Sequence, residues 1–285
     1  MRKNLCELRR LRSDRERGVK VRKGVGKTVQ ARQLGRHLRE VRKEAGLSVD
    51  QAAAELGLST PTMYRFETGL SVPRSPDLKA LCAAYGVDGE LTDALIALAK
   101  EANTPGWWHS FNGGVPRWFD TYVALESSAE HIRAYDAELV VGLLQTRAYA
   151  EATHRIVVPE PSDSERDQRV SARMQRQKLL ARRKAPRVEV ILGEAALRRR
   201  VGEPAVMTEQ LRSLDAASRL PHVTIRVLPI DRPHCALIAG ARFNILTFPG
   251  GRISEPPLAY TESLCGALYL DKPVEYQVYD AVWQA

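Results

Sequence analysis

The stretch "LSVDQAAAELGLSTPTMYRFETG", Leu47–Gly69, contains two short helical patterns with a glycine between them. Ser48 precedes the first pattern and has a glutamine three residues later, which is the spacing of a capping box at a helix start. Gly57 ends this pattern and permits a sharp turn. Ser59 heads the second pattern as its predicted cap, with Pro61 in the first turn, where a missing N–H costs little. The stretch predicts two short helices joined by a tight turn.

Three further helical patterns flank this stretch. An amphipathic pattern with leucines four residues apart precedes it and stops at Gly46. Downstream, Ser75 is the predicted N-cap of a helix, Pro76 takes its first position, and Gly86 ends it. Asp88 then opens a fifth helical pattern. We expect a compact, mainly α domain of five helices.

The longer remainder of the chain changes in periodicity. We expect helices over residues 119–139, 142–156, 161–181 and 206–218. Strand-like stretches, rich in Val, Ile, Leu, Tyr and Phe and bounded by Pro or Gly, cover residues 187–197, 223–230, 241–248 and 258–270. The C-terminal part is therefore expected to be α+β, with helices followed by a mixed or antiparallel sheet.

These patterns predict four segments of distinct composition. Residues 1–29 are a basic flexible arm, and residues 30–102 are the helical domain. Residues 103–118 are a connector that holds three of the four tryptophans and is expected to pack on the second domain. Residues 119–285 form the α+β domain.

Positive charge is concentrated at the N-terminus. Residues 1–46 contain 16 Lys and Arg against 5 Asp and Glu, a net +11, so the rest of this +9 chain carries −2. Such polarity suits a polyanionic partner at that end, although a solvated basic tail without a target is the alternative. The arm also contains "GVGKT", Gly24–Thr28, but Val21 occupies the position where a phosphate-binding loop requires glycine. We do not expect nucleotide binding there.

The second helix of the opening stretch is a candidate DNA reader. Such a helix can enter a major groove about 12 Å wide. Arg65 can offer a bidentate fork to guanine, and Tyr64 can bond a phosphate or pack on a thymine methyl. The predicted DNA-binding residues are Ser59, Thr60, Pro61, Thr62, Tyr64, Arg65 and Arg74. An ordinary helical hairpin is the alternative, but the basic arm and the lack of apolar anchors on the outer face favour DNA.

The opening stretch resembles the helix-turn-helix of the lambda-repressor/Cro-like regulators, the xenobiotic-response-element (XRE) family. The matching residues are Gly46, Leu47, Ser48, Ala53, Gly57, Ser59, Arg65, Glu67 and Gly69. The resemblance implies a structural ion pair between Glu67 and Arg42. Val49 and Pro61 stand where the family often has polar residues that contact DNA, which shifts specificity onto Thr60, Thr62, Tyr64 and Arg65.

The resemblance continues through "GWWHSF", "YVALESSAEHIRAYDAELVVGLLQTRAYA", "GEAALRR", "VTIRVLPI" and "YTESLCGALYL". These segments are similar to an uncharacterised C-terminal domain that is fused to this helix-turn-helix in many regulators of GC-rich actinobacteria. Some of those regulators are antitoxin-like and lie beside genes for small partner proteins. The resemblance implies that the second domain senses a partner protein or a small molecule.

No catalytic, cofactor or metal constellation is visible in the sequence. The histidines at positions 109, 131, 154, 222 and 234 lie in different elements, and four widely spaced cysteines indicate reduced thiols. His234 and Cys235 could begin a nucleophile pair or a metal site, but a structural role is favoured. Acidic residues near strand ends are Asp231, Glu255 and Glu262. We therefore expect no enzyme activity.

Together these observations predict a sequence-specific DNA-binding transcriptional regulator. It would act in the cytoplasm, at the nucleoid, as a homodimer on a palindromic double-stranded operator, with no membrane segment. Its second domain would sense a small partner protein or a small-molecule ligand. The alternatives are an antitoxin-like interaction module that autoregulates its operon, and an enzyme or toxin domain that the helix-turn-helix targets.

Overall fold

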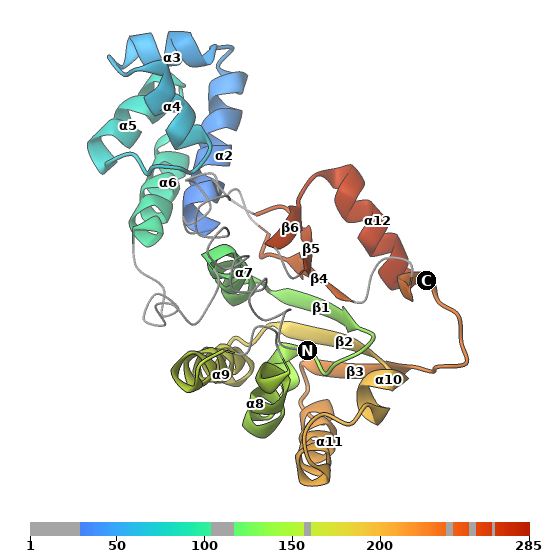
Figure 1. Ribbon diagram of the computed structural model, residues 1–285. Helices are drawn as coiled ribbons and strands as arrows, with labels where there is room; N and C mark the ends of the chain where they lie inside the picture. The colour runs from blue at the N-terminus through green and yellow to red at the C-terminus, as the bar shows by residue number, and fades with distance from the viewer. Residues whose placement is uncertain (1–28, 104–116, 157–160, 238–241, 251–254, 264–265) are drawn as a thin grey trace, which may run out of the picture.

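The computed structural model describes residues 29–103, 117–156, 161–237, 242–250, 255–263 and 266–285. The predicted arm up to residue 28, with its "GVGKT", and most of the predicted aromatic connector lie outside these residues. The described chain forms an N-terminal helical domain followed by an α+β domain with a mixed sheet (Figure 1). The fold class predicted from the sequence is therefore confirmed.

The helical domain consists of the five helices that the sequence predicts. They are α2 (Val29–Glu44), α3 (Val49–Glu55), α4 (Thr60–Glu67), α5 (Ser75–Ala84) and α6 (Gly89–Ala102). Gly46, Gly57, Gly69 and Gly86 follow the first four helices with φ between 63° and 73°, the left-handed region that favours glycine at a helix end. Leucines from α2, α5 and α6 share one apolar core with Met63 of α4.

The helix starts agree with the sequence in two cases and differ in two. Ser48 and Asp88 accept hydrogen bonds from backbone N–H groups of α3 and α6, as predicted caps should. Ser59 stands at the N-cap position of α4, but its hydroxyl bonds that of Thr62 at 2.8 Å and caps no backbone N–H. For α5 the N-cap is Arg74, because Ser75 is already helical and Pro76 follows it.

The second domain is built on six strands in the order β3-β2-β1-β4-β5-β6 within the described chain. Their bounds are β1 (His131–Asp136), β2 (Arg187–Gly193), β3 (Val223–Leu228), β4 (Arg242–Thr247), β5 (Leu258–Ser263) and β6 (Gly266–Leu270). The first three strands are parallel to each other, and the last three pair antiparallel. The sheet is therefore mixed, with β1 at the junction of the two halves.

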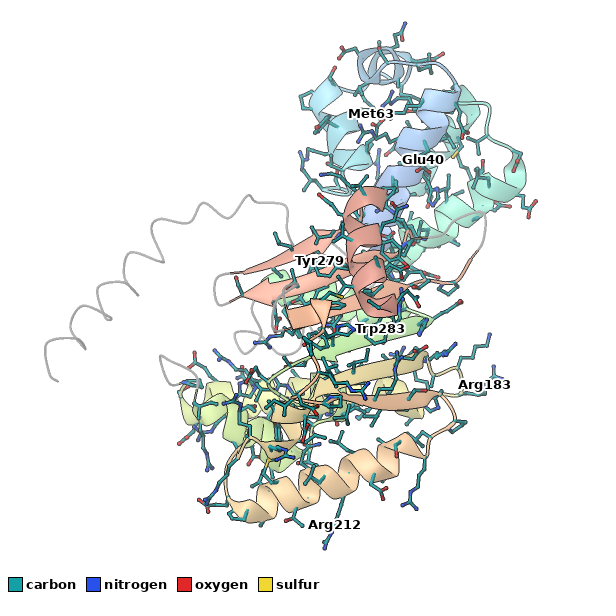
Figure 2. All side chains as sticks on the ribbon, turned by 90° about the vertical axis from the view of Figure 1, so that its right-hand side faces the viewer. Glu40, Met63, Arg183, Arg212, Tyr279 and Trp283 are labelled. Carbon is teal, nitrogen blue, oxygen red and sulfur yellow. The ribbon has the colours of Figure 1, made fainter. Side chains whose placement is uncertain are left out.

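Helices cover both faces of this sheet (Figure 1). One face packs against α7 (Arg117–Ser128), α8 (Arg147–Arg155) and α11 (Pro204–Ser218), while α9 (Asp163–Gln177) lies against α8. The other face packs against α12 (Pro273–Gln284), whose Trp283 is buried (Figure 2). Short helical turns occur at α10 (Glu194–Arg198), Gly142–Leu144, Lys178–Ala181 and Cys235–Leu237.

Several predicted elements of this domain were wrong in type or extent. The predicted helix 119–139 ends at Ser128, and its second half is the strand β1. The end of the predicted strand 187–197 is the helix α10, and the predicted helix 142–156 begins with a 3-10 turn. Residues 258–270 form two strands rather than one, and α12 was not predicted.

The two domains meet where α2 lies against the β6 end of the sheet. Arg36 forms an ion pair with Glu255 at 3.1 Å and a longer one with Asp271 at 3.4 Å. Arg32 reaches the same aspartate at 3.4 Å, and its guanidinium lies 5.9 Å from the ring centre of Tyr269. Across the part of the chain that the structure describes, we find no helix with the length and apolarity needed to span a bilayer.

Candidate functional site

Helix α4, the predicted reader, is held on the helical domain by its inner face. Met63 and Phe66 are buried in the domain core. On the neighbouring helix α2, a Cβ built on Gly35 would lie only 2.5 Å from the carbonyl oxygen of Phe66. The two helices therefore touch backbone to backbone, which leaves little freedom in the position of α4.

A buried ion pair secures the C-terminal end of α4. Arg42 Nε lies 2.5 Å from one carboxylate oxygen of Glu67, and its Nη2 lies 3.0 Å from the other. The same guanidinium donates to the carbonyl of Leu47 at 2.6 Å, and the hydrogen bond with Glu67 raises the pKa of Arg42. This is the pair that the family resemblance implies, and both partners are almost completely buried. It supports the fold and does not face solvent.

The outer face of α4 brings most of the predicted DNA-binding residues together. Tyr64 is 61% exposed, and Arg65 is exposed beside it. The Arg65 guanidinium has no hydrogen bond or ion pair within the described chain, so its donors remain available. Thr60 and Pro61 are exposed at the start of the helix, and Thr62 is half-buried there.

Three of the hydroxyls in this set already have partners. Thr60 donates its hydroxyl to the carboxylate of Asp50, on α3, at 2.7 Å. Thr62 shares its hydroxyl with Ser59. Asp50, which was not among the predicted residues, thus places a negative charge next to the face proposed to meet DNA. These bonds leave Tyr64 and Arg65 as the most available side chains of the set.

Arg74 differs from Arg65 because its guanidinium is already paired with an acid. Its Nε lies 2.9 Å from Asp77, three residues along α5. The hydrogen bond with Arg74 lowers the pKa of the Asp77 carboxyl. The i, i+3 spacing in "RSPD" is visible in the sequence and could have revealed this pair.

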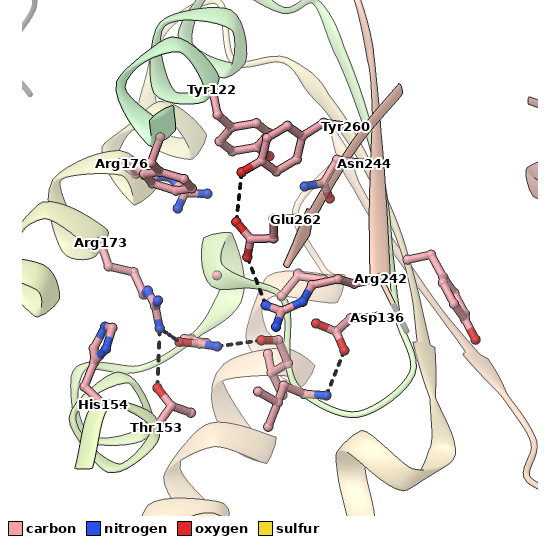
Figure 3. Close-up of a pocket in the computed structure, with 17 residues that line it drawn as sticks. Tyr122, Asp136, Thr153, His154, Arg173, Arg176, Arg242, Asn244, Tyr260 and Glu262 are labelled. Atoms are coloured by element: carbon pink, nitrogen blue, oxygen red, sulfur yellow. Dashed lines mark hydrogen bonds and ion pairs between the residues drawn. The ribbon is translucent and has the colours of Figure 1, made fainter. Parts of the chain in front are cut away.

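The C-terminal domain contains a cavity of about 230 Å³, lined by charged, polar and apolar side chains, that could not be predicted from the sequence. It lies between α7, α9 and the sheet, and Arg173, Arg176 and Arg242 point toward it (Figure 3). Its walls come from segments that are far apart in the sequence. No local spacing of residues would have found it.

The candidate catalytic residues of the sequence analysis do not converge among the described residues. The Cys235 sulfur lies 3.9 Å from Nδ1 of His234, but that nitrogen accepts the backbone N–H of Ala236 at 3.0 Å, and no acid bonds the ring. Glu255 pairs with α2 across the domain contact, whereas Glu262 lies in the cavity. In the ranges that the structure covers, no group of three or more His, Cys, Asp or Glu residues is arranged so that it could hold a metal ion.

The remaining histidines are equally dispersed. His131 lies 3.0 Å from Glu189 across β1 and β2, and burial lowers its pKa. His154 lines the cavity, and His222 precedes β3. His109 and two of the cysteines, Cys6 and Cys265, lie outside the described residues.

Comparison with known families agrees with this division of the chain. Residues 33–95, which span α2 to α6, match a helix-turn-helix domain. Residues 119–285 match a domain of unknown function, DUF5753. No curated protein matches the chain. The surface formed by α3 and α4 is therefore that of a helix-turn-helix domain, a class that binds DNA. The match to DUF5753 covers more than half of the chain. The chain therefore belongs to the DUF5753 family and carries a helix-turn-helix domain N-terminal to the DUF5753 domain.

Proposed function

We propose that the protein is a sequence-specific, DNA-binding transcriptional regulator of the lambda-repressor/Cro-like type. The observation that carries the proposal is the asymmetry of α4. Its inner face is locked to α2 by Gly35 and by the Arg42–Glu67 pair, while Tyr64 and Arg65 project from its outer face. A rigid helix with available donors on its outer side is what major-groove readout requires.

Within this proposal Arg65 carries most of the base discrimination. Its planar fork matches the O6 and N7 acceptors of guanine, and no acid within the described chain competes for it. The hydroxyls of Thr60 and Thr62 must first break their hydrogen bonds with Asp50 and Ser59 before they can bond to DNA. Ser59 and the start of α4 would meet a phosphate, and the basic residues before position 29 would add contacts that depend on salt.

The protein would act in the cytoplasm as a homodimer, so that two copies of α4 enter successive major grooves of a palindromic operator. The C-terminal domain would sense the signal. Its cavity makes a small ligand the favoured signal, in preference to a partner protein.

The test is a selection from random double-stranded DNA with the full-length protein, followed by titration of the enriched sequence. We expect Arg65→Ala to weaken binding by about 1–3 kcal/mol and to relax the preference at one base pair of each half-site. The matched control is Arg212→Ala, which removes the same charge from the exposed surface of α11 in the other domain (Figure 2). The control should bind as tightly as the unaltered protein.

Two results would count against the proposal. If no sequence is enriched over non-specific binding, the protein is not a sequence-specific regulator. If Arg65→Ala and Arg212→Ala have equal effects on affinity and preference, α4 is not the reader.

A further inference from the structure

The cavity of the C-terminal domain contains three arginines, and two of them are matched by acids. Arg176 pairs through two hydrogen bonds, of 2.7 and 2.8 Å, with the buried carboxylate of Glu126. Arg242 donates to Glu262 at 3.0 Å, and Glu262 also accepts the hydroxyl of Tyr260 at 2.8 Å (Figure 3). The charges of these two arginines are therefore compensated inside the protein.

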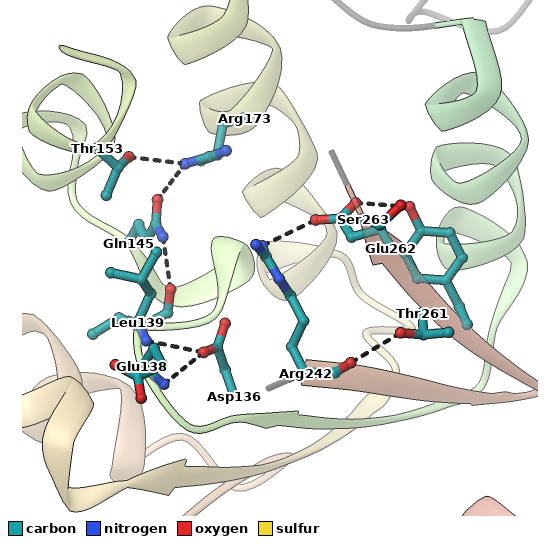
Figure 4. A network of polar contacts seen from close by, with 12 residues as sticks. Asp136, Glu138, Leu139, Gln145, Thr153, Arg173, Arg242, Thr261, Glu262 and Ser263 are labelled. Atoms are coloured by element: carbon teal, nitrogen blue, oxygen red, sulfur yellow. Dashed lines mark hydrogen bonds and ion pairs between the residues drawn. The ribbon is translucent and has the colours of Figure 1, made fainter. Parts of the chain in front are cut away.

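Arg173 is the exception. Its guanidinium donates to the amide oxygen of Gln145 at 2.5 Å and to the hydroxyl of Thr153 at 3.4 Å, both of which are neutral (Figure 4). No carboxylate pairs with it in the part of the chain that the structure describes. Burial, and after it the charge of Arg176, lowers the pKa of Arg173 to about 10. The side chain remains a cation at neutral pH and lacks a counter-ion.

Next to Arg173 lie further polar groups without partners. Both ring nitrogens of His154 are buried and make no hydrogen bond within the described chain, and the same holds for Nε of Arg169. Burial, followed by the charges of Arg173 and Arg169, lowers the pKa of His154 to about 4. The charges of two arginines thus act on a neutral imidazole, and no acid among the described residues bonds any of the three side chains.

Such an arrangement is costly unless something completes it. A half-buried cation without a counter-ion and buried polar nitrogens without hydrogen bonds each cost free energy, and native proteins rarely keep them without a reason. Such groups are expected at functional sites, because a bound ligand can supply the missing counter-ion and hydrogen bonds. An oxyanion satisfies a guanidinium and a neighbouring imidazole N–H at the same time.

We propose that the cavity beside Arg173 and His154 is a binding site for a small anionic ligand whose carboxylate or phosphate group pairs with Arg173. The volume of about 230 Å³ lies below the range of about 300–1,000 Å³ typical of drug-sized ligands, so the ligand is small. The rings of Tyr122 and Tyr260, with centroids 4.2 Å apart, form an aromatic wall for its body.

The opposite side of the cavity limits the charge of the ligand. Asp136 accepts the backbone N–H groups of Glu138 and Leu139, and burial raises the pKa of its carboxyl (Figure 4). Together with Glu262 it would repel a second negative charge on that side. The ligand that fits best has one anionic end toward α9 and an uncharged remainder.

The role of this cavity as the signal site of a regulator rests on the proposed function. Anion binding itself can be tested without DNA. We would titrate the full-length protein with inorganic phosphate and, separately, with benzoate by isothermal titration calorimetry. We expect saturable binding of one anion per chain at millimolar concentration or below. If phosphate binds more tightly than benzoate, the ligand group is a phosphate, and if benzoate binds more tightly, it is a carboxylate.

The variants locate the binding. Arg173→Gln should weaken binding about tenfold or more, because a charge-assisted pair is lost, and Arg173→Lys should restore part of it. His154→Phe keeps the ring but removes its N–H and should also weaken binding. The matched control, Arg183→Gln, removes an exposed arginine of the same domain and should bind as the unaltered protein does (Figure 2). Circular dichroism would check the fold of each variant.

Two outcomes would overturn the site: neither anion binds at millimolar concentration, or both cavity variants bind as tightly as the control. Either outcome leaves the DNA selection experiment intact, and a failed DNA selection leaves anion binding intact.

Discussion

At the scale of single residues, two arginines three positions apart on α9 have opposite roles. Arg176 neutralises the almost inaccessible carboxylate of Glu126 and lies 4.9 Å from the ring centre of Phe119. Although burial opposes its charge, the interaction with Glu126 raises the pKa of Arg176. Arg173 neutralises nothing. The same residue type, on the same helix face, stabilises the fold at one position and leaves a charge for a ligand at the other.

This difference predicts that loss of the two arginines has unequal effects on the free energy of unfolding. Arg176→Gln leaves Glu126 buried without its partner, so we expect the free energy of unfolding to fall by about 3–5 kcal/mol. Arg173→Gln removes an uncompensated cation and keeps an amide that can bond to its neighbours, so we expect a change within about 1 kcal/mol. Urea unfolding of both variants, followed by circular dichroism, measures the difference. Equal losses in the two variants would contradict this assignment of roles.

The sequence could predict the buried Arg42–Glu67 ion pair but not the arginines of the cavity. The Arg42–Glu67 pair followed from the resemblance of a short contiguous motif. The cavity arginines lie in "RVSARMQRQ" and "ARFNILTF", where regular spacing and solvated surface explain a charged residue equally well. Only the packing of α9 against α8 and the Gly142–Leu144 turn reveals that Arg173 faces the cavity. The partners that define its environment are not adjacent to it in the sequence.

At the scale of elements, β1 shows why helical periodicity misleads. The segment "HIRAYD" continues a helical pattern, and Arg133 in its centre is unusual for a buried strand. In the structure Arg133 points to the opposite face from Ile132 and pairs with Asp280 of α12 at 2.6 Å. The charge is tolerated because a distant helix supplies its acid. The five N-terminal helices were predictable because their caps and glycines are local signals.

The crossing of α2 and α4 gives a prediction at this scale. Gly35→Ala would place a methyl group 2.5 Å from the carbonyl of Phe66 and 2.8 Å from that of Glu67, so the helices must separate. We expect the helical domain to lose about 1–3 kcal/mol or more of stability, and DNA binding with it. Gly89→Ala, at the start of α6, meets no atom within 4 Å and is the matched control. It should be neutral or stabilise by about 0.5–1 kcal/mol.

Thermal unfolding of both glycine variants checks this prediction. If Gly35→Ala unfolds at the same temperature as Gly89→Ala, the close approach of α2 to α4 does not hold the reading helix in place.

At the scale of the whole molecule, the cavity and the helical domain are joined by a continuous line of contacts. Tyr122 and Tyr260 line the cavity. The ring of Tyr260 lies 5.2 Å from that of Tyr269 on β6, and Tyr269 faces the guanidinium of Arg32 on α2. Beside this line, Arg36 pairs with Glu255. Burial raises the pKa of the Glu255 carboxyl, and the positive charge of Arg36 partly offsets this rise. If a ligand shifts the tyrosine pair, these contacts give the shift a path to α2.

Spatial continuity does not by itself establish coupling, which is a difference in binding free energy. If the two proposals hold together, a saturating anion should change the affinity for the selected DNA by about fivefold or more. Thermodynamic linkage requires that the DNA change the affinity for the anion by the same factor. Fluorescence anisotropy with labelled DNA, at zero and saturating anion, measures the first factor, and calorimetry on the DNA complex measures the second.

The variant that isolates the connection is Tyr269→Leu. Tyr269 is outside the cavity lining, so this change should leave anion affinity in the absence of DNA unaltered. It removes the ring contacts with Tyr260 and Arg32, so the anion should then change DNA affinity by less than about twofold. Val278→Ala, at an exposed position on α12, is the control and should keep the full effect. If Tyr269→Leu retains the full effect as well, the signal reaches α2 by another route, and the ion pairs of Arg36 with Glu255 and Asp271 become the next contacts to remove.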